Sequence, residues 1–257
     1  MSDAVIDVEG LSMGWDTTVL LRDATFSVAR GEIFAILGGS GCGKSTLLRH
    51  LIGLEAPQSG TISLFGDPHP TLEIGRPPFG VTFQSGALFG SMTVGDNVAL
   101  PLEQWTKLPP SAVAAIVRAK LRLVGLEGTE DKLPSELSGG MKKRAAIARA
   151  MVLEPELLFL DEPSAGLDPV SAVELDELIK SLNEGHGLTV VIVTHELPSI
   201  FKIVTRCIML DKKSKSIIAT GDPRELRDTS EDPRVHHFFH RETATVEAEP
   251  TGRETML

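Results

Sequence analysis

A glycine-rich segment at residues 38–45 constrains this chain more than any other feature. It reads Gly38-Gly39-Ser40-Gly41-Cys42-Gly43-Lys44-Ser45 and matches the pattern G-x-x-x-x-G-K-[ST]. An apolar run, Ile33 to Leu37, precedes it, and a run with helical spacing, Ser45 to Ile52, follows it. Phosphate binding needs this order of strand, loop and helix, because the loop N–H groups and the helix N-terminus both face the anion. The segment therefore predicts a binding site for a nucleoside triphosphate.

Each part of this loop has an expected contact with the nucleotide. The backbone N–H groups surround the phosphates, Lys44 places a positive charge beside the β- and γ-phosphates, and Ser45 offers a hydroxyl to Mg²⁺. Cys42 lies among these donors and near Lys44, a setting that predicts a lowered thiol pKa and a reactive cysteine. The alternative is a small residue that is tolerated at a variable position of the loop. The predicted nucleotide-binding residues of the loop are Gly38, Gly39, Ser40, Gly41, Cys42, Gly43, Lys44, Ser45 and Thr46.

Composition narrows the class of protein further. The 257 residues are 42% hydrophobic, enough for a substantial core, and the formal net charge of −10 disfavours broad affinity for nucleic acid. No apolar stretch approaches the roughly 20 residues that cross a bilayer, and the N-terminus lacks the pattern of a signal peptide. Only two cysteines occur, Cys42 and Cys207, so a disulfide framework is not expected. These features predict a cytoplasmic protein.

Hydrophobic periodicity predicts an α/β fold built around the phosphate loop. Expected strands lie at 4–8, 19–28, 61–65, 80–83, 157–160 and 189–193, and expected helices near 45–52, 111–124, 141–152 and 170–182. The first two strands should pair antiparallel through a turn at 14–16, and residues 66–78 should form a loop. Because the strands at 157–160 and 189–193 are wholly apolar and alternate with helices, they indicate a parallel sheet covered on both faces.

The same reading divides the chain into parts. One domain is expected over residues 1–241, with a helical subdomain inserted at about 93–155. A C-terminal extension at about 222–241 carries two helical patterns that begin with proline. Residues 242–257 are polar and resemble a disordered tail.

Three further motifs occur downstream of the phosphate loop. Asp161 and Glu162 end an apolar strand, where an acidic residue can reach Mg²⁺ beside the loop. Leu-Ser-Gly-Gly at 137–140 precedes a helix, and by itself it could be only a capped turn. His195 follows the apolar strand at 189–193, and a lone histidine is more often structural than functional.

Taken together with Ser-Ala-Gly-Leu-Asp at 164–168, these motifs resemble the nucleotide-binding subunit of ABC transporters over residues 4–225. The resemblance implies a cassette fold in which a homodimer holds ATP and Mg²⁺ between the phosphate loop of one copy and the 137–140 motif of the other. It implies ATPase activity, with Glu162 as general base and His195 as a γ-phosphate contact. The implied Mg²⁺ ligands or associates are Ser45, Gln84 and Asp161, and Gln84 also touches the attacking water. Ser138, Gly139 and Gly140 would serve the partner's ATP, and Asp168 would face the partner.

Trp15 stands where this family usually has a tyrosine that stacks on adenine, and the chain contains no tyrosine. An indole offers a larger aromatic face, so stacking is expected to survive. The alternative is that Trp15 packs in the core.

Details of the motifs resemble one branch of the family, the MCE/Mla lipid-transport systems. These details are Met141 after the 137–140 motif and the runs at 83–89, 162–169 and 195–200. The resemblance implies an ATPase on the cytoplasmic face of a bacterial inner membrane that drives phospholipid transport between inner and outer membranes. Implied partners are an integral-membrane permease, a STAS-domain protein and an MCE-domain lipid-binding protein, with no nucleic acid. Residues 85–98 would dock the permease through Phe89, Met92 and Val94, for which core packing is the alternative.

Other functions stay open from the sequence. An ATPase for import of amino acids or another small solute would carry the same nucleotide motifs. Non-transport ABC ATPases usually add coiled-coil insertions, zinc modules or a second cassette, and none of these patterns occurs here. The sequence identifies neither the cargo nor the direction of transport, nor a role for His236, His237 and His240 in the C-terminal extension.

Overall fold

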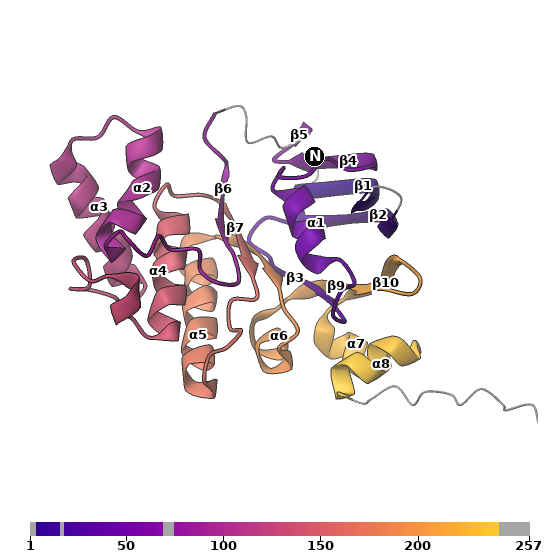
Figure 1. The fold of residues 1–257 in the computed structure, drawn as a ribbon. Helices are drawn as coiled ribbons and strands as arrows, with labels where there is room; N and C mark the ends of the chain where they lie inside the picture. The colour runs from indigo at the N-terminus through magenta and orange to yellow at the C-terminus, as the bar shows by residue number, and fades with distance from the viewer. Residues whose placement is uncertain (1–3, 16–17, 69–74, 242–257) are drawn as a thin grey trace, which may run out of the picture.

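A computed structural model describes residues 4–15, 18–68 and 75–241 of the chain. Its centre is a six-stranded sheet in the order β10-β9-β3-β8-β7-β6 (Figure 1). The strands are β3 (Ile33–Gly38), β6 (Phe79–Thr82), β7 (Leu157–Asp161), β8 (Thr189–Val193), β9 (Arg206–Asp211) and β10 (Ser216–Gly221). The first five run parallel, and β10 pairs antiparallel with β9. This sheet confirms the predicted parallel arrangement.

A second sheet is antiparallel and has the order β2-β1-β4-β5. It is formed by β1 (Ala4–Trp15), β2 (Thr18–Ala29), β4 (Ser59–Leu64) and the two-residue β5 (Asp67–Pro68). The predicted turn at 14–16 is wrong for its first two residues, because β1 continues through Trp15, whose register partner is Thr18. Asp16 lies outside the described residues, and so do residues 69–74 of the predicted loop at 66–78. Asp67 and Pro68, within that predicted loop, form β5 instead.

Two apolar clusters pack against opposite faces of the parallel sheet, because side chains alternate along each strand. On β3, Ile33, Ala35 and Leu37 face the cluster made with the helices, whereas Phe34 and Ile36 face the cluster made with the antiparallel sheet and α1 (Lys44–Leu51). Helices therefore cover one face, and the second sheet with α1 covers the other (Figure 1).

The helices of the first face form two groups. Helices α2 (Val94–Trp105), α3 (Pro110–Leu123) and α4 (Gly139–Met151) pack together at the β6 end of the sheet, with a short 3-10 turn at Pro134–Glu136 (Figure 1). Helix α2 begins at a capping box in which Thr93 and Asp96 exchange backbone and side-chain hydrogen bonds. Helices α5 (Pro169–His186) and α6 (Leu197–Ile203) pack side by side under the centre of the sheet. The helices at 45–52, 111–124 and 141–152 predicted from the sequence occur within one or two residues of those bounds.

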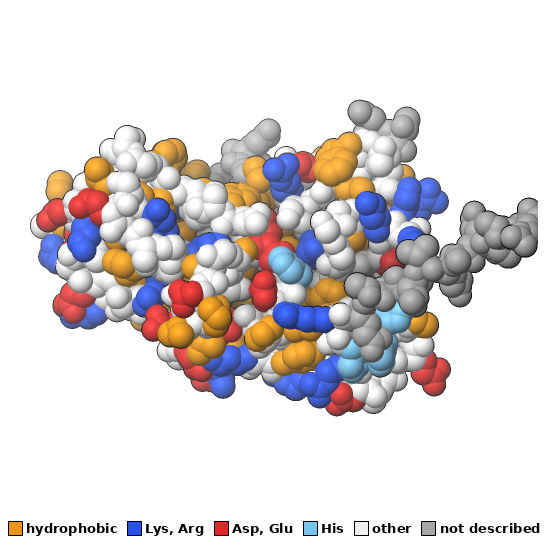
Figure 2. Space-filling model, turned by 60° about the horizontal axis from the view of Figure 1, so that its bottom comes forward, with side chains coloured by type: hydrophobic (Ala, Val, Ile, Leu, Met, Phe, Trp, Pro, Cys, Tyr) orange, Lys and Arg blue, Asp and Glu red, His pale blue; other side chains and the backbone are white. Residues whose placement is uncertain are grey.

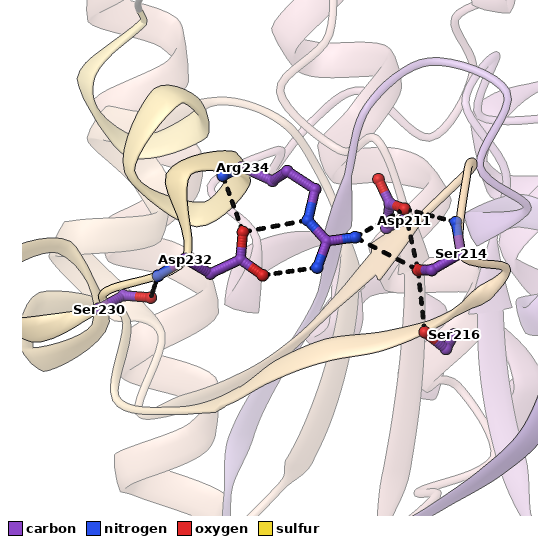
Figure 3. A network of polar contacts seen from close by, with 6 residues as sticks. All are labelled: Asp211, Ser214, Ser216, Ser230, Asp232 and Arg234. Atoms are coloured by element: carbon purple, nitrogen blue, oxygen red, sulfur yellow. Dashed lines mark hydrogen bonds and ion pairs between the residues drawn. The ribbon is translucent and has the colours of Figure 1, made fainter.

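The two C-terminal helices confirm the predicted proline starts. They are α7 (Pro223–Thr229) and α8 (Pro233–His240), and each is capped by an aspartate, Asp222 or Asp232. Arg234 of α8 donates hydrogen bonds to Asp232 and to Asp211 at the end of β9 (Figure 3). Asp211 in turn accepts hydrogen bonds from Ser214, so this network holds α8 to the β9–β10 hairpin (Figure 3).

Candidate nucleotide-binding site

The phosphate loop joins the carboxyl end of β3 to the N-terminus of α1, as predicted. Two of its glycines are required by geometry. Gly38 has φ 140°, and a Cβ there would lie 2.5 Å from the carbonyl oxygen of Leu210. Gly43, the residue before α1, has φ 102°, in the left-handed region that side chains disfavour. The loop conformation therefore depends on glycine at both ends.

Lys44 and Ser45, at the start of α1, contact different groups: Lys44 contacts the phosphate loop itself, and Ser45 contacts the end of β7. The Lys44 ammonium donates to the carbonyl oxygens of Gly38 and Gly39, at 2.9 and 3.3 Å, so the charge lies over the loop. The Ser45 hydroxyl donates to Oδ1 of Asp161 at 3.2 Å. The structure thus brings the end of β7 against the phosphate loop. Thr46, also predicted, is buried in the first turn of α1.

Asp161 is a buried carboxylate with a perturbed pKa. Burial is the main cause that raises it, and the neighbouring charge of Glu162 adds to that effect. The hydrogen bond from Ser45 and the charges of Lys44 and Lys143 act in the opposite direction. A cation next to this carboxylate would relieve the destabilisation of its charged form.

Glu162 and His195 are hydrogen-bonded partners. His195 Nδ1 lies 2.8 Å from Oε1 of Glu162, although 33 residues separate the two in the sequence. The other carboxylate oxygen, Oε2, is buried and has no hydrogen-bond partner among the described residues. Glu162 also has φ 48°, and its N–H donates to the carbonyl of Val193 at 2.8 Å. Its backbone is therefore fixed in an uncommon conformation.

Gln84 follows the carboxyl end of β6, at the same edge of the sheet as Glu162. Its carbonyl oxygen accepts a hydrogen bond from Lys143 of α4, and the same ammonium donates to the Glu162 carbonyl at 3.1 Å. Arg149, six residues further along α4, donates to the carbonyls of Ala87 and Gly86 at 2.8 and 3.1 Å. The structure thus brings the segment after β6 close to Glu162 through the side chains of α4.

The 137–140 motif lies apart from the phosphate loop of the same chain. Ser138 caps α4 by accepting a hydrogen bond from the Met141 N–H at 3.3 Å. A Cβ added to Gly139 would lie 3.4 Å from Leu167, and one added to Gly140 would lie 3.4 Å from Ser171. Within the described ranges, no hydrogen bond joins Ser138, Gly139 or Gly140 to the phosphate loop. The motif packs beside the start of α5 instead.

Asp168 is the N-cap of α5. Its carboxylate accepts hydrogen bonds from the N–H groups of Val170 and Ser171, both at 3.0 Å, and from the Ser171 hydroxyl. The hydrogen bonds from Ser171 lower the pKa of this exposed carboxyl. Asp168 therefore fixes the start of α5.

Trp15 is 51% exposed at the end of β1, so the core-packing alternative is wrong. Met13, two residues earlier, lies on the same face of the strand, and its Cε would lie 3.2 Å from a Cβ at Gly43. This end of the β1–β2 hairpin therefore adjoins the phosphate loop, with the indole open to solvent.

The exposure of Cys42 and the pKa of its thiol differ from what the sequence predicts. Its side chain is only 2% exposed and belongs to the cluster between the two sheets. Burial raises the pKa of the thiol, and this outweighs the lowering effects of Lys44 and nearby N–H groups. The predicted lowered pKa is wrong because the side chain points into the apolar cluster, away from the phosphate-binding surface.

Lys143 and Arg149 are the site-adjacent residues that sequence reasoning missed. Their partners are backbone carbonyls, which leave no trace in the residue types, so the sequence carries no signal for these contacts.

Histidine side chains gather over α8 in Figure 2, from His236, His237 and His240. In the described parts of the chain, no group of three or more His, Cys, Asp or Glu side chains is arranged to hold a metal ion. Nor does any described helix combine the length and apolarity that crossing a membrane requires.

A glycine loop at the carboxyl edge of a parallel sheet, with Asp161 and Glu162 on a nearby strand, defines a phosphate-loop ATPase. Residues 21–165 match the ABC transporter family model. The chain belongs to this family and is an ATP-binding, ATP-hydrolysing cassette.

Among its relatives, the intermembrane phospholipid transport system ATP-binding protein MlaF of Escherichia coli strain K12 is 41% identical over 241 residues, which cover 91% of this chain and 88% of MlaF. The probable ribonucleotide transport ATP-binding protein mkl of Mycobacterium leprae is 42% identical over 241 residues, covering 91% of this chain and 68% of the relative. A solved dimer of the cassette MJ0796, in a post-hydrolysis state bound to ADP and Pi, superimposes with a TM-score of 0.74 at 26% identity, covering 84% of this chain and 98% of that one.

Proposed function

We propose that this chain powers phospholipid transport between the inner and outer membranes of a bacterium, as the ATPase of an MCE/Mla-type system. The similarity to MlaF over nearly the full length of both chains supports this cargo. The cassette would run to residue 241, with residues 93–155 as its helical subdomain. The observation that carries the ATPase mechanism is Glu162, held by His195 beside the contact between Ser45 and Asp161.

The active form would be a homodimer with two ATP molecules at its interface. Support comes from the separation of the 137–140 motif from the phosphate loop of the same chain and from the dimeric relative MJ0796. Gly38 to Thr46 would bind the phosphates, and Trp15 would stack on adenine. Ser138, Gly139 and Gly140, at the N-terminus of α4, would contact the partner's γ-phosphate, and Asp168 would face the partner.

The residues beside the phosphate loop fit Mg²⁺. Ser45 and Asp161 present two oxygen atoms 3.2 Å apart, and Mg²⁺ prefers oxygen ligands. Gln84 would complete the protein's contribution. When bound, the ion would neutralise charge that develops on the β- and γ-phosphates.

Chemistry would then depend on a few side chains of this protein. Lys44 would leave the carbonyls of Gly38 and Gly39 for the phosphate oxygens, which are stronger acceptors for an ammonium. Glu162 would accept a proton from the attacking water, oriented by the hydrogen bond at Oε1. His195 would maintain that orientation and contact the γ-phosphate.

The chain would act on the cytoplasmic face of the inner membrane, bound to a permease and acting with STAS-domain and MCE-domain partners. Phe89, 52% exposed after the segment held by α4, is a suitable permease contact. Val94 is buried in the core, so its predicted contact with the permease is wrong. Asn97 fixes the Phe89 backbone by two hydrogen bonds, at 2.8 and 3.1 Å.

Purification of the chain from membranes with its partners tests this function. Mass spectrometry of the gently solubilised complex should find a multi-spanning permease and retained phospholipid. Reconstituted into vesicles, the complex should transfer labelled phospholipid to an acceptor only with ATP. Transfer of a water-soluble solute instead, with no phospholipid retained, would identify the complex as a solute importer.

A further inference from the structure

We propose that Lys143 is a positioning residue that makes the helix α4 and the hydrolytic residues Gln84 and Glu162 move as one unit. The inference rests on the proposed roles of these two residues and deepens them. It assigns to a lysine of the helix that begins at Ser138 a direct effect on the geometry of ATP hydrolysis in the same chain.

The first support is the double contact of the Lys143 ammonium. The ammonium donates to the carbonyl oxygen of Gln84, just after β6. It also donates to the carbonyl oxygen of Glu162, just after β7, at 3.1 Å. The strands β6 and β7 are neighbours in the sheet. A single charged group on α4 thus joins two segments that must hold a fixed relation to the attacking water.

The second support is the backbone of Glu162. A non-glycine residue at φ 48° is strained and persists where its surroundings fix it. Here the N–H donates to the Val193 carbonyl, and the C=O accepts from Lys143 at 3.1 Å and from the Ala165 N–H at 3.2 Å. Removing the ammonium would release one of these three restraints, the one that ties Glu162 to α4, and the Glu162 carboxylate would then sample orientations away from His195.

Arg149 supplies the third support. Its hydrogen bonds to the carbonyls of Gly86 and Ala87 fasten the rest of the segment after Gln84 to the same helix. Cations one and a half turns apart on α4 therefore hold residues 84–87 at both ends. A shift of α4 would displace this whole segment with it.

The consequence concerns communication between the two ATP sites of a dimer. Ser138 lies five residues before Lys143, about 7 Å along the helix. If Ser138 contacts the partner's γ-phosphate, the same rigid helix reports that contact to Glu162 and Gln84 of its own chain. Lys143 would thus link each site to the other.

Three variants test the proposal in the full complex or the purified full-length dimer. Lys143→Met removes the charge and keeps the length, Lys143→Arg keeps a charge, and Lys142→Met is the matched control on the neighbouring residue of the same helix. For Lys143→Met we expect kcat to fall about tenfold with KM for ATP within twofold. Lys143→Arg should recover most of the loss, and Lys142→Met should match the unaltered protein.

Rescue by arginine distinguishes a charged restraint from simple packing. A guanidinium keeps the positive charge and can donate to the carbonyls of Gln84 and Glu162, so recovery of kcat in Lys143→Arg supports the restraint. Full kcat in a Lys143→Met protein, or a Lys143→Arg protein as slow as Lys143→Met, would overturn the proposal.

Failure of the proposal is separable from failure of the proposed function. If Glu162→Gln keeps its turnover, the assignment of the general base is wrong. If Glu162→Gln is inactive while Lys143→Met hydrolyses ATP at the normal rate, only the role of Lys143 is wrong. Should Lys143→Met not fold, as judged by its thermal midpoint, Lys143→Ala takes its place, and normal kcat in that variant would likewise overturn the proposal.

Discussion

Replacement of Glu162 by glutamine should abolish turnover without harming the fold. The substitution keeps the size and shape of the side chain, and an amide oxygen can still accept the hydrogen bond that His195 Nδ1 makes to Oε1 at 2.8 Å. It removes the ability to take a proton from water. Any loss of rate therefore reports the chemistry of the carboxylate rather than its position.

The expected loss of rate follows from the role of Glu162 as a positioned general base. A positioned general base contributes about 10²–10⁴-fold to rate, equivalent to about 3–5 kcal/mol of barrier. The effect on stability should be small, because Oε2 of Glu162 already lacks a partner among the described residues and a buried unsatisfied group costs about 1–3 kcal/mol in either form. We expect kcat to fall at least 100-fold, with the unfolding free energy changed by less than about 1 kcal/mol.

Steady-state ATPase measurements and urea unfolding would be run on Glu162→Gln and on Glu196→Gln. Glu196 is a suitable control, since its carboxylate lies 3.7 Å from the other ring nitrogen of His195 but is far more exposed. The Glu162 variant should also accumulate as an ATP-bound dimer in size-exclusion chromatography. Turnover above a tenth of normal, or an equal loss in the control, would refute the assignment of Glu162 as base.

Three further outcomes test other parts of the site. A mixed dimer of one Ser138→Arg copy and one Glu162→Gln copy should hydrolyse ATP faster than either homodimer, because both defects then fall in one composite site; a rate no higher than the homodimers would place the motif in its own chain's site. Trp15→Ala should weaken ATP binding about tenfold, as loss of a base–aromatic stack costs about 1–3 kcal/mol; Trp105→Ala, on α2, serves as the control in the same titration. Burial is the main cause that raises the pKa of Asp176. Between about pH 4 and that raised value the folded state keeps a proton that the unfolded state has lost. Stability should thus fall as pH rises through this window, and Asp176→Asn should lack that fall in urea unfolding.

Local patterns in the sequence were sufficient to predict the phosphate loop, its strand and its helix. Their residue types alone specify the turn, as Gly38 and Gly43 show by their φ angles. The strands β7 and β8 were equally clear because their runs are wholly apolar and buried.

The strands β9 and β10 were missed for a physical reason. β9 is adjacent to β3 in the sheet, and their paired residues, such as Phe34 and Arg206, are far apart in the chain. β10 is half-buried at every residue except the exposed Thr220, so no alternation of buried and exposed residues marks it. Tertiary pairing, rather than local preference, decides both strands.

Contacts of side chains with groups far away in the chain could also not be predicted from the sequence. The hydrogen bond between Glu162 and His195 was not predicted, because the family resemblance gave each residue a separate role and did not pair them. The carbonyl partners of Lys143 and Arg149 could not be read from residue types at all. Cys42 shows the opposite error, since its neighbours in sequence suggested an electropositive setting, whereas the fold turns its side chain into an apolar cluster.

Strand β3 is enclosed by packing on both faces and by strands on both edges. Phe34 and Ile36 pack in the cluster with the antiparallel sheet, Ala35 and Leu37 pack in the cluster with the helices, and β8 and β9 pair with its edges. Because β3 cannot shift or tilt without disrupting both apolar clusters, the phosphate loop at its end is held in a fixed position for binding the triphosphate. If the chain drives a permease as we propose, the moving part would then be the bundle α2–α4 at the β6 end of the sheet, with the permease attached to it.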